Sequence, residues 1–497
     1  MPETTAMLLK NARRLGRGNL NDVLIRGGKI AAMYPSDGSS PNYGSWRNTP
    51  EVYDLDGRYL LPGLWDHHVH FPQWVAQRRR LDLSESCSGA HVLETVRATA
   101  RTSDAEVLVG YGFRDGLWPD RPSLAAIDAV ESVRPVVLVS ADLHCGWLNT
   151  PAFERIGRPM TSSGLLREDE FFGVINQLQN SDELTIAACR DAAAAAARRG
   201  VVGVVEFENA DNPLQWAQRV ESGVDQLRII ASIRPDRLDA VIDHGLHTGD
   251  RLDSQGLVTM GPLKAVVDGS LNTRTAWCWE PYPGMDQGTT GAYGTETVSL
   301  TELHGLMAQA QAADLGVAIH AIGDRANSVV LDTFAELDMS GTVEHAQLVA
   351  AADFRRFGEL GLVASVQPEH AMDDRSVADL HWRGRTDRAF ALASLASTGG
   401  ILRFGSDAPV APLDPWLAIA SAVYRSRGDD EPWHAEQRLG IASALAASTR
   451  GREEAGVGDP ADLVVVERNP LTASRDELRE MPVAATLLAG EFTWFNL

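Results

Sequence analysis

Three histidines stand within four positions in the segment LLPGLWDHHVHF, residues 60–71. Histidine is the commonest metal ligand in proteins and the usual proton carrier near neutral pH. Because side chains alternate between the two faces of a strand, His68 and His70 are expected on one face and His67 on the other. A His-x-His pair is weak evidence alone, so its meaning depends on whether distant segments supply further ligands.

Four more polar residues stand at or near the ends of strand-like apolar runs: Lys264 in GPLKAVVD, His320 in GVAIH, His345 in TVEH and Asp407 in ILRFGSD. Only three of the 45 basic residues are lysines, and Lys264 is the one surrounded by strand-forming apolar residues. Four imidazoles and a carboxylate suit zinc, manganese or iron. A lysine ammonium would repel a cation, but its amine can add carbon dioxide to give an anionic carbamate that bridges two metals. That reaction would also remove the cost of an unpaired buried charge.

This set of residues predicts hydrolysis at a pair of divalent metal ions. The two metals would share a bridging hydroxide and polarise a substrate carbonyl. Asp407 would ligate one metal, accept the proton of the attacking hydroxide and pass it to the leaving nitrogen, as general base and then general acid. Each residue alone has an ordinary structural explanation. Six of them together are hard to explain as core packing, since buried polar groups need partners.

Eight short apolar runs alternate with helical segments, a pattern typical of βα units around a parallel sheet. The runs cover residues 62–70, 200–207, 227–233, 261–268, 316–320, 342–345, 362–367 and 401–407. Helices are expected at 185–200 and at 299–316, the second ending on a glycine. Eight units predict a (β/α)8 barrel of the TIM type over residues 62–456, with the strand ends converging on one pocket at its top face.

The rest of the chain is expected to build two additions to the barrel. Residues 1–61 and 457–497 contain short strands with turn signals, including an Arg-Gly-Gly-Lys hairpin turn, and we expect them to pair into one small β-sandwich. The interval of about 72–185 is too long for one helix and holds two strand candidates, AEVLVGYGF and PVVLVSADLH. It is therefore predicted to be an insertion over the barrel mouth.

Composition narrows the class of protein further. The 497 residues carry a net charge of −22, which argues against a nucleic-acid partner because no basic excess is available to neutralise phosphates. No apolar run reaches the ~18 residues of a membrane span, and the N-terminus does not resemble a signal peptide. Cys87, Cys145, Cys189 and Cys278 form no CxxC pair, which fits reduced thiols. We expect a cytoplasmic protein that acts on a small-molecule substrate. A homodimer is one option for its assembly.

Several motifs resemble those of a known family. PGLWDHHVHF resembles the opening motif of the amidohydrolase superfamily, and IHAIGDRA, VEHAQLV and FGSDAPVAPLDP resemble its later motifs. KAVVDGSLNTRTAW and VSADLHCGWLNTPAF are similar to segments of the YtcJ-like branch, amidohydrolase family 3. The resemblance covers nearly the whole chain and implies a binuclear metal hydrolase. The implied ligands are His68, His70, carboxylated Lys264, His320, His345 and Asp407.

The resemblance also implies hydrolysis of C–N bonds, with N-substituted formamides and related amides as the known substrate type. Two departures keep it from specifying the substrate. His67 stands where the family usually has a small residue, and residues 373–395, which we expect to line the pocket rim, depart from the usual pattern.

Residues outside the metal set are candidates for substrate contacts: His144, Trp147, Arg274 and His370. His144 and Trp147 belong to the insertion motif, and His370 lies near the end of the seventh strand. Arg274 follows the fourth strand and would bind a carboxylate or pair with a surface acid. His244 and His247 are expected in a solvated loop over the mouth.

Three alternatives remain open from the sequence. A mononuclear deaminase would use similar histidines and an aspartate, but Lys264 and the lack of a glutamate shortly after His320 argue against it. An esterase, lactonase or phosphotriesterase would share all six ligands. A catalytically inactive scaffold would usually lose ligands, whereas this chain keeps them. Metal content separates the scaffold from the enzymes, and a screen of amides, esters and lactones separates the enzymes from one another.

Overall fold

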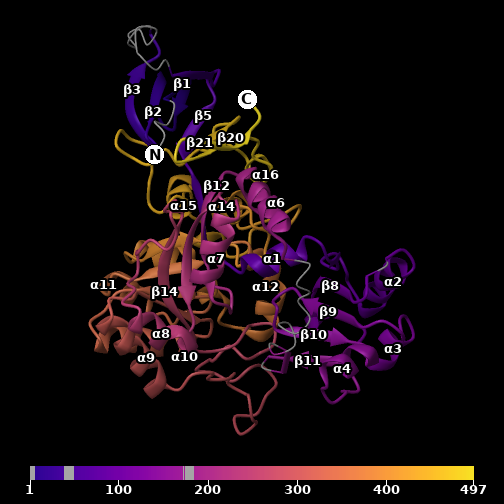
Figure 1. Cartoon of the computed structure of the whole chain (residues 1–497). Helices are drawn as coiled ribbons and strands as arrows, with labels where there is room; N and C mark the ends of the chain where they lie inside the picture. Colours follow the sequence, from indigo (N-terminus) through magenta and orange to yellow (C-terminus); the bar gives the residue numbers. More distant parts are fainter. Residues whose placement is uncertain (1–5, 38–49, 104, 169, 172, 174–183) are drawn as a thin grey trace.

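The structure is a computed structural model, and it describes residues 6–37, 50–103, 105–168, 170–171, 173 and 184–497. Its strands form three sheets: a barrel, a sheet built from both ends of the chain, and the sheet of an insertion. In Figure 1 the sheet of the chain ends lies above the barrel and the insertion lies to its right. In the described part of the chain, none of the helices has the length and apolar content needed to cross a bilayer.

The barrel sheet contains eight parallel strands that follow one another in chain order. They are β6 (Leu64–Val69), β12 (Val201–Glu206), β13 (Arg228–Ile233), β14 (Val258–Val266), β15 (Val317–Ala321), β16 (Thr342–His345), β17 (Val363–Val366) and β18 (Ile401–Phe404). The chain after β18 closes the barrel against β6, where Asp407 N–H donates to the His68 carbonyl over 2.7 Å and Val69 bridges Ala408. Each of the eight predicted runs overlaps one of these strands, so the barrel prediction is confirmed.

Helices surround the barrel and connect its strands (Figure 1). They are α1 (Phe71–Gln77), α6 (Ile186–Ala197), α7 (Asn212–Glu221), α8 (Leu238–Asp243), α9 (Leu300–Ala312), α10 (Asp324–Glu336), α11 (Phe354–Glu359), α12 (His370–His381), α13 (Leu392–Ser397), α14 (Pro415–Tyr424) and α15 (Ile441–Ser448). In α6 the Thr185 hydroxyl caps the first turn by accepting from Ala188 N–H, and its buried face is mostly alanine, which permits close packing.

The expectation that the helix at 299–316 ends on a glycine is wrong. Helix α9 ends at Ala312, well before Gly316. The left-handed residue that follows the helix is Asp314, with φ 52°. Aspartate tolerates this conformation better than most residues, so it can take the place that glycine usually fills.

Strands from the two ends of the chain are hydrogen-bonded to one another, which confirms the prediction that both ends build one small β-sandwich. Its strands are β1 (Met7–Arg14), β2 (Leu20–Arg26), β3 (Lys29–Pro35), β4 (Glu51–Asp54), β5 (Tyr59–Pro62), β19 (Leu463–Val466), β20 (Val483–Leu488) and β21 (Glu491–Phe495), with α16 (Arg475–Arg479) between β19 and β20. Antiparallel pairing of β5 with β19 connects the two ends. Gly27 and Gly28 have φ 59° and 73°, as the predicted hairpin turn requires.

The insertion folds around a five-stranded sheet of its own. Its elements are β7 (Leu81–Asp82), α2 (Gly89–Ala100), β8 (Leu108–Phe113), α3 (Leu124–Asp128), β9 (Val136–Ser140), β10 (Cys145–Leu148), α4 (Thr150–Ile156) and β11 (Leu165–Arg167). The two predicted strands correspond to β8 and β9. Phe113, Asp142 and His144 of the insertion line the cavity at the barrel mouth. The insertion therefore forms part of the site that the barrel strands position.

Candidate active site

A cavity of about 620 Å³ opens at the carboxyl ends of the barrel strands, a size that suits a small molecule. All six predicted ligands line it: His68, His70, Lys264, His320, His345 and Asp407. They come from β6, β14, β15, β16 and the residues just after β6 and β18. Parallel strands of a closed barrel all end at one face, which is why residues so distant in the sequence meet here.

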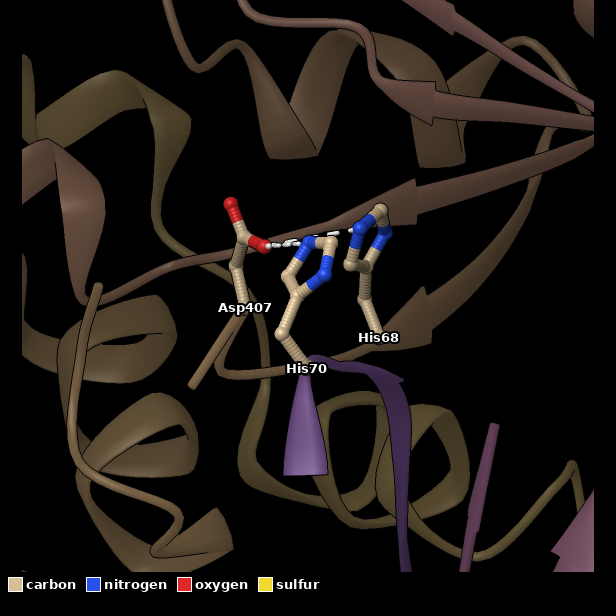
Figure 2. Close-up of side chains that lie close together, drawn as sticks. All are labelled: His68, His70 and Asp407. Carbon is tan, nitrogen blue, oxygen red and sulfur yellow. Dashed lines mark ion pairs between the residues drawn. The ribbon is translucent and has the colours of Figure 1, made fainter. Parts of the chain in front are cut away.

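His68, His70 and Asp407 converge most closely (Figure 2). The Nε2 atoms of both histidines lie 3.4 Å from Asp407 Oδ1, and one potential ligand atom of each residue lies within 4.8 Å of the others. His67 takes the opposite side of β6, as the alternation predicts. Its Nδ1–H donates to the Phe404 carbonyl over 3.1 Å, so this histidine links β6 to β18 outside the cavity.

Two of the six residues have an unusual backbone conformation. His345 has φ 73° and Asp407 has φ 57°, in the left-handed region that residues with a Cβ seldom adopt. Both stand where the chain leaves its strand. Such strain persists only where the surroundings enforce it, and it clusters at functional sites. The His345 ring lies 4.8 Å from the His68 ring and 4.5 Å from the His320 ring, measured between centroids, so the turn brings it into the group.

Hydrogen-bonding partners behind the imidazoles fix their orientation. His68 Nδ1–H donates to Glu344 over 2.5 Å, and His345 Nδ1–H donates to Gln367 Oε1 over 2.9 Å. These bonds leave the Nε2 atoms of both rings free to act as ligands. Sequence reasoning missed Glu344 and Gln367. A signal was present, since each lies at the end of a predicted strand and Glu344 directly precedes a predicted ligand.

Asp268 supports the imidazole of His320 in a different way. Its carboxylate is fully buried and lies 3.5 Å from His320 Nε2. The backbone N–H groups of Ile322, Gly323 and Trp277 all donate to it. Burial nevertheless raises the pKa of Asp268 to about 7. The residue thus ties the turn after β15 to the segment after β14.

The electrostatics of the cavity favour the neutral form of three of the four imidazoles. Burial, assisted by the nearby Lys264 charge, lowers the pKa of His68 and His320 well below the ordinary value, and burial with the neighbouring His320 does the same for His345. Burial opposes the charged form of His70 as well, but the hydrogen bond to Asp407 and the negative charges of Asp407, Glu208 and Glu206 together outweigh it, and the pKa of His70 is raised. Neutral imidazoles present the lone pairs that metal coordination requires.

Lys264 is the most unusual member of the set. Its side chain is 2 % exposed, and its Nζ has no hydrogen-bond partner among the described residues. The Nζ atom lies over the Phe207 ring, 4.6 Å from its centroid. Burial lowers the pKa of Lys264 to about 8, so part of the amine is uncharged near neutral pH. Only the uncharged amine can add carbon dioxide, and the donor set therefore fits two metals held by a carbamate, four imidazoles and Asp407.

Two of the candidate substrate contacts line the cavity. His144 donates through Nδ1–H to Glu168 over 2.7 Å; burial opposes its charge, but Glu168 outweighs burial and raises the pKa of His144 to about 9. His370 lies at the start of α12, and its Nε2–H donates to the Ser406 carbonyl over 3.2 Å. Both side chains are therefore placed to meet a bound substrate.

The other two candidates lie outside the cavity. Trp147 is 1 % exposed and packs inside the insertion, where its indole N–H donates to the Ser123 carbonyl over 3.4 Å. Arg274 is exposed on the segment after β14 and does not line the cavity. Of residues 373–395, all of which the structure describes, only Asp374 reaches the cavity wall. Buried apolar residues of this segment pack with residues that follow β14, β15 and β16, and they do not line the cavity, so the predicted lining role holds only for Asp374.

The expectation that His244 and His247 lie over the mouth is also wrong. They follow α8 and precede β14, so their loop stands at the amino end of the strands, away from the cavity. The His244 ring donates back to the Ala240 carbonyl over 2.6 Å, and His247 pairs with Asp250. The direction of the chain through a helix–strand connection, which the local sequence does not reveal, decides on which face such a loop lies.

The fold and the cavity place the chain among barrel hydrolases, and comparison with known proteins makes the class specific. A sequence model described as the amidohydrolase family matches residues 51–494. The chain therefore belongs to the amidohydrolase family, as its motifs predicted.

The chain is similar to several named members over most of its length. It is 24 % identical to the putative amidohydrolase YtcJ of Bacillus subtilis, covering 96 % of this chain and 98 % of the relative. It is also 24 % identical to the N-substituted formamide deformylase of Arthrobacter pascens, covering 94 % of both. The protein LONG AFTER FAR-RED 3 of Arabidopsis thaliana is 29 % identical over 89 % of this chain and 82 % of its own.

Solved structures show the same fold. A metal-dependent hydrolase of Pyrococcus horikoshii has a TM-score of 0.77 at 23 % identity, covering 95 % of this chain and 99 % of its own. A second from Pyrococcus furiosus has a TM-score of 0.74 at 24 % identity, covering 94 % and 100 %.

Proposed function

We propose that this chain is a metal-dependent hydrolase that cleaves a C–N bond in an amide or an N-formyl or N-acyl amine. The residues that would hold two divalent ions, with zinc first and manganese or iron as alternatives, are His68, His70, carboxylated Lys264, His320, His345 and Asp407. Membership in the amidohydrolase family supports the reaction class. The similarity to a protein named N-substituted formamide deformylase supports N-formyl amines as the first substrates to try.

One observation carries the proposal: the buried Lys264 amine that has no hydrogen-bond partner among the described residues. An ammonium in this place has no hydrogen-bond partner among the described residues, and with burial its charge lowers the pKa values of three neighbouring imidazoles. A carbamate on the same nitrogen would instead supply oxygen ligands and a negative charge. That chemistry distinguishes a two-metal hydrolase from a mononuclear deaminase.

Bound divalent ions would activate a water molecule and polarise the carbonyl of the substrate. We assign the role of proton carrier to Asp407, which lines the cavity and whose Oδ1 lies 3.4 Å from the Nε2 atoms of His68 and His70. It would take a proton from the attacking water as the oxygen bonds to the carbonyl carbon. When the C–N bond breaks, the electron pair goes to nitrogen, and Asp407 returns the proton to it.

A combined metal and substrate test decides the function. Protein loaded with zinc, manganese or iron should contain about two metals per chain by elemental analysis, and it should hydrolyse members of a panel of N-formyl and N-acyl amines. One metal or none would contradict the two-metal centre. Turnover restricted to esters, lactones or phosphotriesters would replace the C–N reaction with one of those alternatives.

A further inference from the structure

The cavity contains a second cation that the proposed mechanism does not use. Arg234 is the first residue after β13 and lines the cavity. Its guanidinium makes no hydrogen bond and no ion pair with any residue that the structure describes. Its charge nevertheless acts on residues of the candidate metal site. It contributes to lowering the pKa values of Lys264 and His320.

Apart from Lys264, the other cations of the cavity wall, Arg114 and His144, are already paired. Arg114 forms ion pairs with Asp373 over 3.3 Å and Asp374 over 3.4 Å. His144 pairs with Glu168 over 2.7 Å. Arg234 is half-buried, and because a guanidinium stays charged in a protein, even partial burial without a partner is unfavourable. Burial indeed lowers its pKa, despite the neighbouring acids.

The two acidic residues whose charges act on Arg234, Glu208 and Asp236, interact with other groups. Glu208 accepts through Oε1 from Gln73 Nε2 over 3.1 Å and from the Asn209 backbone over 2.9 Å. Asp236 is exposed and lies 3.5 Å from the Arg237 guanidinium. The Glu208 Oε2 atom is buried without a hydrogen-bond partner among the described residues, yet it does not come within ion-pair distance of Arg234. The guanidinium is therefore available to a ligand in the cavity.

We propose that Arg234 binds a carboxylate of the substrate and so determines specificity. This inference rests on the proposed function. It specifies the substrates as N-formyl or N-acyl compounds that carry a free carboxylate. The planar fork of a guanidinium matches a carboxylate with two parallel hydrogen bonds. A dianion is disfavoured because Glu208, Asp374 and Asp407 also line the cavity. Arg234 takes the role that the sequence suggested for Arg274, which is exposed outside the cavity.

Matched substrates test this assignment. Metal-loaded enzyme is given a panel of N-formyl and N-acetyl amino acids, each paired with the amino-alcohol analogue in which a hydroxymethyl group replaces the carboxylate. We expect wild type to prefer the acids in kcat/KM, and Arg234→Gln to lose about tenfold to a hundredfold on the acids, mainly through KM. The alcohols should change little. Arg234→Lys should retain part of the preference, and the matched control Arg237→Gln, altered at an exposed arginine three residues away, should retain all of it.

Two results would overturn the assignment: a wild type without preference, or an Arg234→Gln enzyme that loses equally on acids and alcohols. The second result would make Arg234 a support for the wall around Glu208. If wild type loaded with metal hydrolyses no pair, the proposed function fails but the assignment is still decided by calorimetric binding. N-acetylglycine should then bind more tightly than N-acetylethanolamine to wild type, and Arg234→Gln should abolish the difference. Any contribution from the metals is common to both proteins and cancels, provided that their metal contents agree.

Discussion

At the scale of single residues, the Lys264 amine and the imidazoles around it explain each other. The depressed pKa values of His68, His320 and His345 follow from burial and from the lysine charge, and carboxylation of the lysine would remove that charge. The same modification would turn the repulsive member of the group into a ligand. The proposed two-metal centre would therefore account for both the buried amine and the neutral imidazoles.

Substitution of Lys264 tests this coupling. Lys264→Ala should lose most bound metal and activity, because the bridging ligand is gone, and short carboxylic acids added with metal should restore part of both. Lys264→Arg should fail as well, because a guanidinium stays cationic and cannot form a carbamate. The measurements are metal content and turnover of an N-formyl amine. An active Lys264→Arg enzyme would rule out the carbamate.

Substitution of Asp407 can separate its proposed role as a metal ligand from its proposed role as a proton carrier. Asp407→Asn keeps the size of the side chain and one ligating oxygen but cannot accept a proton. General acid–base help is worth about 10²–10⁴-fold, so turnover should fall at least about a hundredfold while the fold and much of the metal remain. The ascending limb of the pH–rate profile should change, since it reports the coupled unit rather than one group. Near wild-type turnover with both metals bound would make Asp407 a ligand only and turn attention to His144 and His370.

At the scale of elements, one antiparallel strand pair of the insertion brings two polar side chains, His144 and Glu168, to the cavity wall. Strands β10 and β11 pair antiparallel with Cys145 opposite Arg167, which places His144 and Glu168 as the next facing pair. The Glu168 N–H donates to the His144 carbonyl, and Thr275 on the segment after β14 donates to the Glu168 carboxylate. The pair therefore ties the insertion to the barrel at the mouth of the cavity.

This tie should depend on pH in a defined direction. The pKa of His144 is raised to about 9, so its stabilising charge is fully present below its unfolded value near 6.5 and is lost as the pH rises through about 9. We expect Glu168→Gln to lower the urea midpoint at pH 7, with a difference from wild type that shrinks towards pH 10. Glu106→Gln, which alters an exposed ion pair of the same insertion, is the control and should show no such trend. A difference independent of pH would contradict the charged state of His144.

The elements themselves were largely predictable from the sequence, for a physical reason. Strands covered on both faces are continuous apolar runs, as in Val201–Glu206, and polar residues at their ends mark the functional face of a barrel. The same logic did not place Trp147 or Arg274, because their orientation depends on how a short strand and a long loop pack. Arg234 was missed although it also ends a predicted strand. It stands between an apolar strand and a proline, without a motif to draw attention to it.

At the scale of the whole molecule, the candidate site draws its residues from distant parts of the barrel. Its six residues come from both sides of the closure between β6 and the chain after β18, and from three consecutive strands opposite it. They are brought together only in the folded chain. Metal bound there must therefore favour the folded state over the unfolded one.

Removal of metal should lower the thermal stability of the entire chain. Binding to the folded state alone stabilises it by about 2.7 kcal/mol when free metal is a hundred times its dissociation constant. We therefore expect chelator-treated protein to unfold at a lower temperature than metal-loaded protein in calorimetry, and reloading to restore the transition. Lys264→Ala should lose most of this metal-dependent shift, whereas Arg237→Gln should keep it, since its side chain lies outside the cavity. Identical transitions for the chelated and the loaded wild-type protein would show that the six residues do not assemble around metal, and the C–N hydrolase proposed here would lose its central requirement.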